Sequence, residues 1–429
     1  MVRVITFLKV AAFAGLASGS ACSGQTLGNL PHPIAVNATI TPFTVNITDD
    51  AIENLKAHLR LYRPPRDTYE SVNAGWEFGV PKEWLVNATD QWLNNYDWRA
   101  EEAVLNSIPQ YKVGLTDDDG EAYSIHFAGL FSNKKDAIPL VMSHGFPDSY
   151  QLFMPFLQMI QAKYADTPDD MPYHIIVPSL VGTGFSSPPP LTKPFYTTDM
   201  ARIMNKFMVA LGFGESGYIA HGTDVSSMIV EYMLEAYDEV KAAHATLWWG
   251  HPDYDSTTQL PANEMEVNAL KRLASTTSWG VGNVAVHRDR SSTIGHTIGN
   301  SPISILTWVG ERYVLWADPS APISMTNLLT DVSLYWFTET YPTSYWCYAQ
   351  FRSSLNDSIP TAPNYTGKRL AYSWFANDVS SPPSAYFKNH SDIYTDFYQH
   401  DKGGHFVPME QPEALWADLT DFIPKVWAQ

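Results

Sequence analysis

Asp224 stands at the centre of a segment whose residue types suit a nucleophile. The stretch GYIAHGTDVSSMI, residues 217–229, has the pattern of a strand, a sharp turn and a helix, with small residues at Gly222, Ser226 and Ser227. Such a turn brings the strand and helix backbones so close together that only small side chains fit around its central residue. The amide dipoles at the start of the helix favour an ionised carboxylate there. We therefore predict that Asp224 attacks an electrophile and becomes covalently bound to it.

Two other interpretations of this turn are open. If Ser226 were the nucleophile, Asp224 and Met228 would occupy flanking positions that have to be small, so this register fits poorly. In the second alternative, Asp224 is a plain turn or helix-capping residue without a chemical role.

A nucleophile of this kind needs a general base and an acid that orients the base. In the segment DKGGHFVPMEQPE, residues 401–413, His405 follows two glycines and precedes a helix that begins near Gln411 and Pro412. Glycines let the backbone bend sharply, so the imidazole is expected to lie over the edge of a sheet. We predict that His405 is the general base.

The orienting acid is expected directly after the strand that precedes this histidine. The segment YSWFANDVSSPP offers Asp378 at that place. The chain order Asp224, Asp378, His405 is the order found in α/β-hydrolases. Three other carboxylates are alternatives, but they lie within or beside the last predicted strand: Asp392, Asp396 and Asp401.

A further turn is predicted to hold the groups that stabilise an oxyanion. The segment VMSHGFPDSY runs from a strand into a tight turn at residues 144–147, and the Phe146–Pro147 bond is a candidate for the cis form. The backbone amides of Phe146 and Val225 are expected to form the oxyanion hole. For His144, a hydrogen bond that stabilises the turn is a better explanation than a catalytic proton role.

A mostly parallel sheet would bring these segments together. From residue 138 onward, short apolar runs alternate with helical patterns: IPLVMSHG, YHIIVPSL, GYIAHG, HATLWWG, RLAYSWF and TDFYQH. Strands that alternate with helices form a parallel sheet covered on both faces, and ligands bind at the carboxyl ends of its strands. The segments that contain Asp224, Asp378 and His405 all follow such strands.

The rest of the chain is expected to surround this sheet. PQYKVGL and YSIHFAGLF predict two antiparallel strands. Upstream, TDDAIENLKAHLRLYR predicts one helix, and PKEWLVNATDQWLNNYDW predicts another with Trp84, Leu85, Trp92 and Leu93 facing inward. Residues 252–350 are dense in Trp and Tyr and lack strand patterns, so we expect a mostly helical cap over the sheet.

The composition restricts the class of partner and cofactor. The 429 residues carry a formal net charge of −18 and contain no basic run, which argues against nucleic acid or an anionic membrane surface as the main partner. The two cysteines, Cys22 and Cys347, exclude a disulfide framework and a zinc site of several thiolates. Histidines do not cluster at ligand spacing, so we expect no metal or organic cofactor. Cys347 is expected to be a small packed side chain.

The first residues predict a route through the secretory pathway. In residues 1–21, Arg3 and Lys9 accompany an apolar stretch that ends in small residues, with a cleavage pattern at Ala21. Because Lys9 interrupts the apolar stretch, an uncleaved anchor with weak membrane association is the alternative. We expect a secreted or endoplasmic-reticulum glycoprotein, since N-x-S/T acceptor sites also occur. These sites are Asn37, Asn46, Asn87, Asn356, Asn364 and Asn389.

The motifs HGFP, GTGFS, HGTDVSS and GGHF, together with Asp378, resemble those of the epoxide hydrolase branch of the α/β-hydrolase superfamily. The resemblance is strongest to its microsomal and juvenile-hormone type, fungal members included. PFTVNITDDAIENLKAHLRLYRPP and WLNNYDWRAEEAVLNSIPQYK resemble the N-terminal domain that wraps around the hydrolase core in that type. The resemblance spans about residues 40–425. The implied organisation is a leader at 1–21, an N-terminal domain at 40–135, an α/β-hydrolase core at 136–251 and 351–429, and the helical cap at 252–350.

The resemblance implies hydrolysis of an apolar epoxide, with water as the second substrate, in secondary metabolism or detoxification. A serine that attacked an epoxide carbon would become an ether, whereas an aspartate becomes an ester that water can hydrolyse. In this scheme His405, oriented by Asp378, activates the water that hydrolyses the ester on Asp224. The oxyanion then faces the amides of Phe146 and Val225. Nothing in the sequence indicates the oligomeric state.

Members of this family typically use two cap tyrosines to assist the leaving oxygen. Tyr348, in YWFTETYPTSYWCYAQF, falls on one of these positions and is the implied proton donor, with Tyr345 and Tyr341 as near alternatives. Counting back from STIGHTIGNSP, the second position is Asn283, where no tyrosine stands. An amide can bind an oxygen but cannot donate a proton as a phenol does. Asn283 is therefore expected only to bind substrate.

This departure leaves other functions open. One is a related enzyme that opens or cyclises epoxides, and another is an enzyme that dehalogenates alkyl halides with the same nucleophile. A catalytically impaired binding protein with a hydrolase fold is a third. Retention of Asp224, Asp378 and His405 favours an enzyme over a binding protein.

Overall fold

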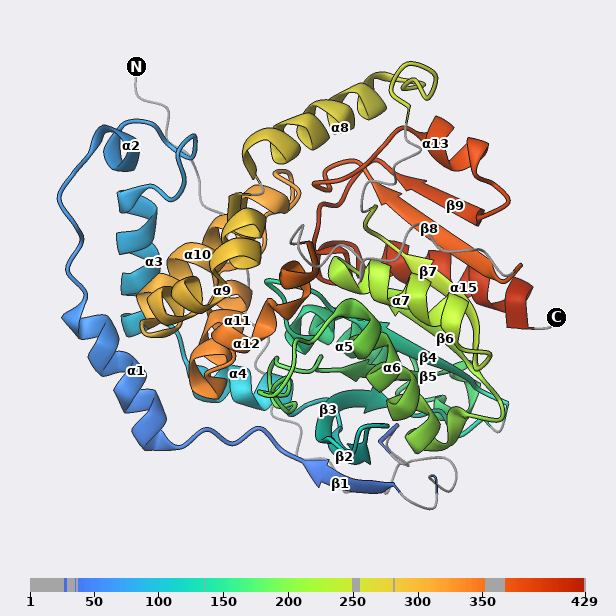
Figure 1. Cartoon of the computed structure of the whole chain (residues 1–429). Helices are drawn as coiled ribbons and strands as arrows, with labels where there is room; N and C mark the ends of the chain where they lie inside the picture. The colour runs from blue at the N-terminus through green and yellow to red at the C-terminus, as the bar shows by residue number, and fades with distance from the viewer. Residues whose placement is uncertain are drawn as a thin grey trace, which may run out of the picture.

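The computed structural model describes residues 27–28, 35, 38–134, 136–248, 255–280, 282–351 and 367–427 (Figure 1). Within these residues one sheet has the strand order β1-β2-β3-β5-β4-β6-β7-β8-β9. β1, β2, β3 and β5 pair antiparallel along this order, and all pairings from β5 to β9 are parallel. The strands are β1 (Thr39–Phe43), β2 (Gln110–Thr116), β3 (Ala122–Leu130), β4 (Ile138–Ser143), β5 (Tyr173–Pro178), β6 (Tyr218–Gly222), β7 (Val240–Ala245), β8 (Arg369–Phe375) and β9 (Tyr394–His400).

Helices cover the central strands, and this explains the continuous apolar runs of the sequence. Every residue of β5 and β6 is buried, as expected for parallel strands with a layer on both faces. α6 packs beside α7, and α15 packs beside α5. The helices of the core are α5 (Met154–Lys163), α6 (Thr197–Met208), α7 (Val225–Ala236), α13 (Ser384–Asn389), α14 (Val407–Glu410) and α15 (Pro412–Trp427).

The region expected to form a helical cap contains helices and, among its described residues, no strand. These are α8 (Glu264–Ser275), α9 (Gly282–Gly299), α10 (Pro302–Trp316), α11 (Met325–Thr338) and α12 (Tyr341–Ser344), followed by the 3-10 helix η5 (Trp346–Phe351). α9 packs against α12 and η5, and α10 packs against α11. This packing brings residues of α9 next to those of η5.

The N-terminal segment lies along the cap helices (Figure 1). Its helices are α1 (Asp49–Leu61), α2 (Tyr69–Val72), α3 (Lys82–Asn94) and α4 (Trp98–Leu105). The Thr48 side chain caps α1 by accepting from the amide of Ala51. The indole of Trp92 donates to Ser333 over 3.1 Å, so α3 is hydrogen-bonded to α11 of the cap.

Two of the predicted elements have different boundaries. The strand expected in HATLWWG is β7, which begins at Val240 and ends at Ala245, because its register is set by pairing with β6 and β8. The apolar run continues beyond the sheet, where the amide of Leu247 donates to Ser227 over 3.1 Å. The second N-terminal helix is broken after Asn94, because Asp97 caps a separate helix, α4. Of its predicted inward residues, Trp92 is buried, and Trp84, Leu85 and Leu93 are partly buried.

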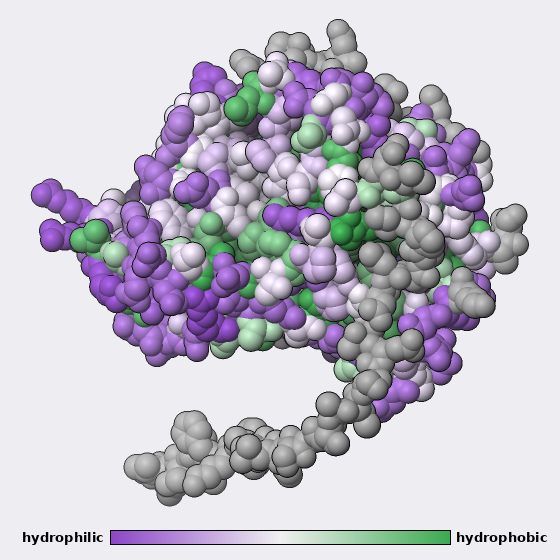
Figure 2. Space-filling view, turned by 90° about the horizontal axis from the view of Figure 1, so that it is seen from below, coloured by the Kyte–Doolittle hydropathy of each residue, from purple (hydrophilic) through white to green (hydrophobic). Residues whose placement is uncertain are grey.

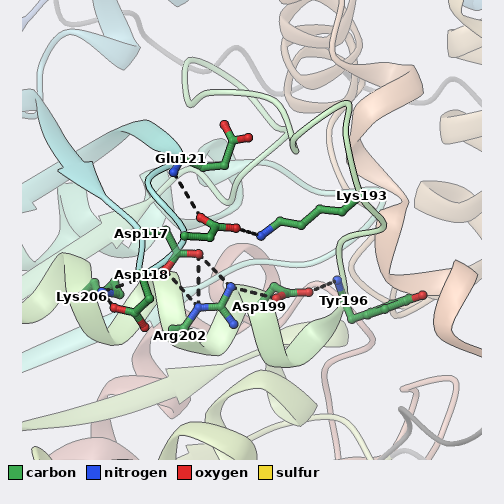
Figure 3. Close-up of polar contacts among 9 residues, drawn as sticks. Asp117, Asp118, Glu121, Lys193, Tyr196, Asp199, Arg202 and Lys206 are labelled. Carbon is green, nitrogen blue, oxygen red and sulfur yellow. Dashed lines mark hydrogen bonds and ion pairs between the residues drawn. The ribbon is translucent and has the colours of Figure 1, made fainter.

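A cluster of ion pairs joins the β2–β3 turn to α6 (Figure 3). Arg202 contacts the buried Asp117 over 2.8 Å and Asp199 over the same distance. Lys206 contacts Asp118 over 2.6 Å. Because these cations are paired with carboxylates, the cluster connects the turn to the helix and does not present a free basic surface.

The surface is largely hydrophilic, in keeping with the net charge of −18. Figure 2 shows one face on which hydrophobic side chains gather near the middle and hydrophilic ones occupy the edges. Among the described helices, none combines the length and apolar character needed to span a bilayer.

Candidate active site

The turn between β6 and α7 has the strained backbone that the sequence predicted. Asp224 has φ 45° and ψ −131°, a backbone conformation that residues other than glycine rarely adopt. A Cβ atom on Gly222 would lie 2.1 Å from the carbonyl oxygen of Ser226, so the position admits only glycine. Asp224 makes no side-chain capping hydrogen bond to α7. The hydroxyl of Ser226, the alternative nucleophile, donates to the carbonyl of His144 and therefore has a structural role.

The carboxylate of Asp224 lies between an amide and an imidazole. Its Oδ1 accepts from the amide of Phe146 over 2.9 Å. Its Oδ2 lies 3.3 Å from Nε2 of His405, without the geometry of a hydrogen bond. The side chains of Asp224 and His405 are 5% and 1% exposed, respectively, so this contact is nearly free of bulk water. The two oxygens therefore have different environments, one facing a fixed donor and the other facing a base.

Asp378 holds His405 in the orientation that a general base requires. Nδ1 of His405 donates to Oδ1 of Asp378 over 2.9 Å, and the same oxygen accepts from the amide of Val379 over 2.6 Å. Asp378 is buried beside His405, whereas Asp392, Asp396 and Asp401 form no hydrogen bond or ion pair with this histidine. The structure therefore brings the three predicted residues Asp224, Asp378 and His405 together.

Two carboxylates determine the charge of the histidine. Burial by itself lowers the pKa of His405, but the charges of Asp378 and Asp224, with the hydrogen bond to Asp378, outweigh burial and raise this pKa well above its ordinary value. A protonated imidazole between two carboxylates is a stable resting state. Loss of the negative charge on Asp224 would remove one of the two influences that favour the protonated form.

Two carboxylates that the sequence interpretation missed position the loop of His405. Glu410 accepts from the amide of Gly404 over 2.7 Å and from that of Asp318 over 2.6 Å. Asp318 in turn accepts from the amide of Gly403 over 2.8 Å. Burial raises the pKa of Glu410 to about 7. Glu410 stands five residues after His405, but only the fold brings Asp318 from the end of α10 to this loop.

The predicted oxyanion hole has one donor in place. The Phe146–Pro147 bond is cis, as predicted, and the Phe146 amide donates to Asp224. A Cβ atom on Gly145 would lie 2.2 Å from Oδ1 of Asp224, so this glycine is required for the approach. The second predicted donor, the amide of Val225, belongs to the first residue of α7, where amides have no acceptor within the helix.

His144 stabilises the same turn, as the sequence indicated. Its Nδ1 donates to the carbonyl of Gly145 over 2.9 Å, and its Nε2 accepts from the amide of Leu180 over 3.2 Å. Burial lowers the pKa of His144 to about 4. The neutral ring thus joins two loops and is not placed to transfer a proton.

Among the three candidate tyrosines, only Tyr348 has an uncommitted hydroxyl. The hydroxyl of Tyr345 donates to the carbonyl of Ser291 over 2.8 Å, and that of Tyr341 lies 3.0 Å from Nε2 of His287. No described residue bonds the hydroxyl of Tyr348, which is buried with its ring edge-on to Phe146 at 5.8 Å. Burial and then the charge of Asp224 raise the pKa of Tyr348 well above its ordinary value, so the phenol stays protonated near the nucleophile.

Asn283 lies at the start of α9 and is buried, and neither its amide nitrogen nor its amide oxygen has a hydrogen-bond partner. One turn further along α9, His287 is fully buried as well. The sequence interpretation missed His287, although its spacing of four residues from Asn283 indicates that both lie on one helix face.

The remaining predicted residues are described only in part. Asn46, Asn87 and Asn389 are exposed, as glycosylation requires. Cys347 is buried and packed, as predicted. Within the described residues no group of three or more His, Cys, Asp or Glu side chains is arranged to hold a metal ion. The leader 1–21, Cys22 and the acceptor sites Asn37, Asn356 and Asn364 lie outside the described residues.

Comparison with protein families gives two matches that follow one another along the chain. Residues 40–153 match the model described as "Epoxide hydrolase N terminus", and residues 138–264 match the alpha/beta hydrolase fold. The first match covers the segment that lies along the cap, and the second contains Asp224.

Comparison with solved structures gives matches over nearly the whole chain. The structure of Aspergillus niger epoxide hydrolase is 36% identical, covers 94% of this chain and 100% of its own, and superposes with a TM-score of 0.84. Juvenile hormone epoxide hydrolase from the silkworm Bombyx mori shares the fold, with a TM-score of 0.76 at 21% identity over 93% of this chain and 99% of its own. In sequence, Epoxide hydrolase 1 of Sus scrofa is 24% identical over 91% of this chain and 89% of its own.

Proposed function

The chain belongs to the epoxide hydrolase family, in its microsomal and juvenile-hormone branch, and from that premise we propose a mechanism through an alkyl ester on Asp224. One observation carries the proposal: the strained turn presents Asp224 with one oxygen on the Phe146 amide and the other 3.3 Å from the His405 imidazole. The enzyme is a hydrolase that converts an epoxide and water into a diol.

In the first step Oδ2 of Asp224 attacks a ring carbon of the epoxide. The carbon–oxygen bond of the ring breaks as the new ester bond forms, and the hydroxyl of Tyr348 gives its proton to the departing oxygen. The hydroxyl is suited to this because it has no other bond among the described residues. The product is a hydroxyalkyl ester of Asp224.

In the second step His405 takes a proton from a water molecule, which attacks Cγ of Asp224. The resulting oxyanion at Oδ1 is stabilised by the amides of Phe146 and Val225. Collapse of this intermediate breaks the ester bond, and His405 returns its proton to the leaving diol oxygen. The proton left on the Asp224 carboxyl then restores the phenol of Tyr348.

The pKa of His405 supports this order of events. In the resting enzyme both neighbouring carboxylates favour the protonated imidazole, which is no base. Ester formation removes the charge of Asp224, so the imidazole releases its proton to solvent before water has to be activated, and it takes up a proton from solvent again when the Asp224 carboxylate is restored. We propose apolar epoxides as substrates, since the residues around Asp224 include Phe146, Tyr348 and Trp316, and a role in secondary metabolism or detoxification.

Hydrolysis in 18O-labelled water tests the ester mechanism. In a single turnover with excess enzyme, the diol should contain no 18O, because its new oxygen comes from Asp224. Later turnovers should yield diol with one labelled oxygen. Labelled diol in the first turnover would mean that water attacks the epoxide directly and would overturn the proposal.

We also propose that residues 1–21 direct the protein into the secretory pathway, where it becomes a glycoprotein. The exposure of Asn46, Asn87 and Asn389 supports this. Loss of apparent mass after endoglycosidase treatment of protein from a eukaryotic secretory host is the expected result, and an unchanged mass would contradict it.

A further inference from the structure

Several buried polar atoms of the cap have no hydrogen-bond partner, and those of Asn283 and His287 lie on one helix. Neither atom of the Asn283 amide has a hydrogen-bond partner, and Nδ1 of His287 has none either. Asn283 is 2% exposed and His287 is 0% exposed. Leaving buried donors and acceptors unpaired destabilises a protein, and such groups call for an explanation in binding or catalysis.

His287 lies on the face of α9 that is next to the reacting residues, and helix spacing puts Asn283 on the same face. Residues four positions apart on a helix are neighbours on one face. The His287 ring is stacked on Tyr348 with centroids 5.4 Å apart, and it lies edge-on to Phe146 at 5.0 Å. Phe146 supplies the amide bound to Asp224, and Tyr348 supplies the uncommitted hydroxyl. His287 therefore contacts the ring of the proposed proton donor and the ring of the residue whose amide binds the nucleophile.

The surroundings fix the form of the His287 ring. Burial and then the positive charge of Arg312 lower the pKa of His287 to about 3, so the ring is neutral. Its Nε2 lies 3.0 Å from the hydroxyl of Tyr341, which makes no other hydrogen bond among the described residues. In the role proposed below, the Tyr341 hydroxyl donates to Nε2, and the single proton of the ring is then on Nδ1, the atom without a partner. A neutral imidazole N–H is an effective donor to a developing alkoxide.

We propose that Asn283 and His287 together donate hydrogen bonds to the oxygen of the opening epoxide, beside Tyr348. This inference rests on the proposed ester mechanism. Tyr348 transfers the proton, while the two N–H groups stabilise the negative charge that builds up on the oxygen before the transfer is complete. His287 also stacks on Tyr345 at 4.3 Å and 9°, which holds the ring in place for this role.

The experiment measures ester formation alone. The substitution His405→Gln removes the base, so the ester on Asp224 accumulates and its rate of formation with styrene oxide is read by intact-protein mass spectrometry. In this background His287→Phe keeps the stacked ring but removes both nitrogens, and Asn283→Leu keeps the size but removes the amide. We expect each to slow ester formation roughly 10- to 100-fold, the loss of one hydrogen bond to a developing charge.

The matched control is His296→Phe, the same substitution at an exposed position of the same helix. It should leave the rate of ester formation unchanged. With His405 intact, ester hydrolysis followed by quenched flow should also be unchanged in His287→Phe, because the alkoxide is no longer present at that stage. A purely structural role would slow both half-reactions.

The outcomes separate the two proposals. If the His405→Gln protein forms no ester on Asp224, the ester mechanism is wrong. If it forms the ester and both His287→Phe and Asn283→Leu react as fast as the control, the two side chains bind at most a buried water and the inference is overturned. Faster ester formation in Asn283→Tyr than in Asn283→Leu would show that the position faces the reacting oxygen. If Asn283→Tyr unfolds, Asn283→Asp takes its place. Its carboxylate should repel the developing negative charge and slow ester formation.

Discussion

Oδ2 of Asp224 and Nε2 of His405 lie 3.3 Å apart in a site from which bulk water is nearly excluded. The carboxylate raises the pKa of the imidazole, and the imidazolium in turn stabilises the carboxylate. In the resting enzyme each charge therefore stabilises the other. This mutual stabilisation is lost in the ester intermediate, in which Asp224 is uncharged.

The pH dependence of the second half-reaction follows from this pair. Only neutral His405 is a base, so ester hydrolysis should increase with pH and level off above the pKa of His405 in the ester state. Because the ester is uncharged, that pKa should be lower than the pKa of His405 in the free enzyme. NMR titration of the free enzyme and of Asp224→Ala, compared with the pH profile of ester hydrolysis, checks this. Equal pKa values of His405 in the free enzyme, in Asp224→Ala and in the pH profile of ester hydrolysis would contradict it.

Tyr348→Phe should slow ester formation by about 10²- to 10⁴-fold, the usual effect of losing a general acid. Stopped-flow or quenched-flow measurement of the ester gives this rate directly. Tyr345→Phe is the matched control three residues away, since its hydroxyl bonds the carbonyl of Ser291. It should lower the stability by about 1 kcal/mol and leave ester formation unaltered. An unchanged rate in Tyr348→Phe would exclude its role as proton donor.

Gly145→Ala should displace the carboxylate of Asp224 and lower activity, although Asp224 itself is unchanged. The added Cβ atom would lie 2.2 Å from Oδ1 of Asp224, so the carboxylate or the turn has to move. A displacement of this size is expected to reduce kcat/KM by about 10²-fold or more. Gly114→Ala, where an added Cβ atom meets nothing within 4 Å, serves as the control. Equal activity of the two variants would show that the Gly145 contact is unimportant.

Glu410 should make the protein less stable as the pH rises. Its pKa is about 7 in the folded state, against an ordinary value of 4.5. The folded state therefore binds more protons than the unfolded state between these values, and stability decreases with increasing pH across that window. Glu410→Gln cannot titrate, so its melting temperature should depend less on pH between about 4.5 and 7. Identical pH profiles of melting temperature for both proteins would refute this.

Local sequence determined much of the site, because the relevant constraints are short-range. The small residues around Asp224, the cis Phe146–Pro147 turn and the glycines before His405 are required by backbone conformation within a few residues. Likewise, the apolar runs that became β4, β5, β6 and β8 reflect burial on both faces of a sheet. These features could be predicted from neighbouring residue types alone.

Other features were decided only by the tertiary structure. The end of β7 depends on pairing with strands distant in sequence. The choice of Tyr348 over Tyr345 depends on a hydrogen bond to Ser291, more than fifty residues earlier. His287 and Asp318 belong to the site only because α9 and the end of α10 pack against η5 and the His405 loop. Helix packing depends on the shapes of many side chains at once, so a single local pattern does not specify which buried polar groups it leaves facing the substrate.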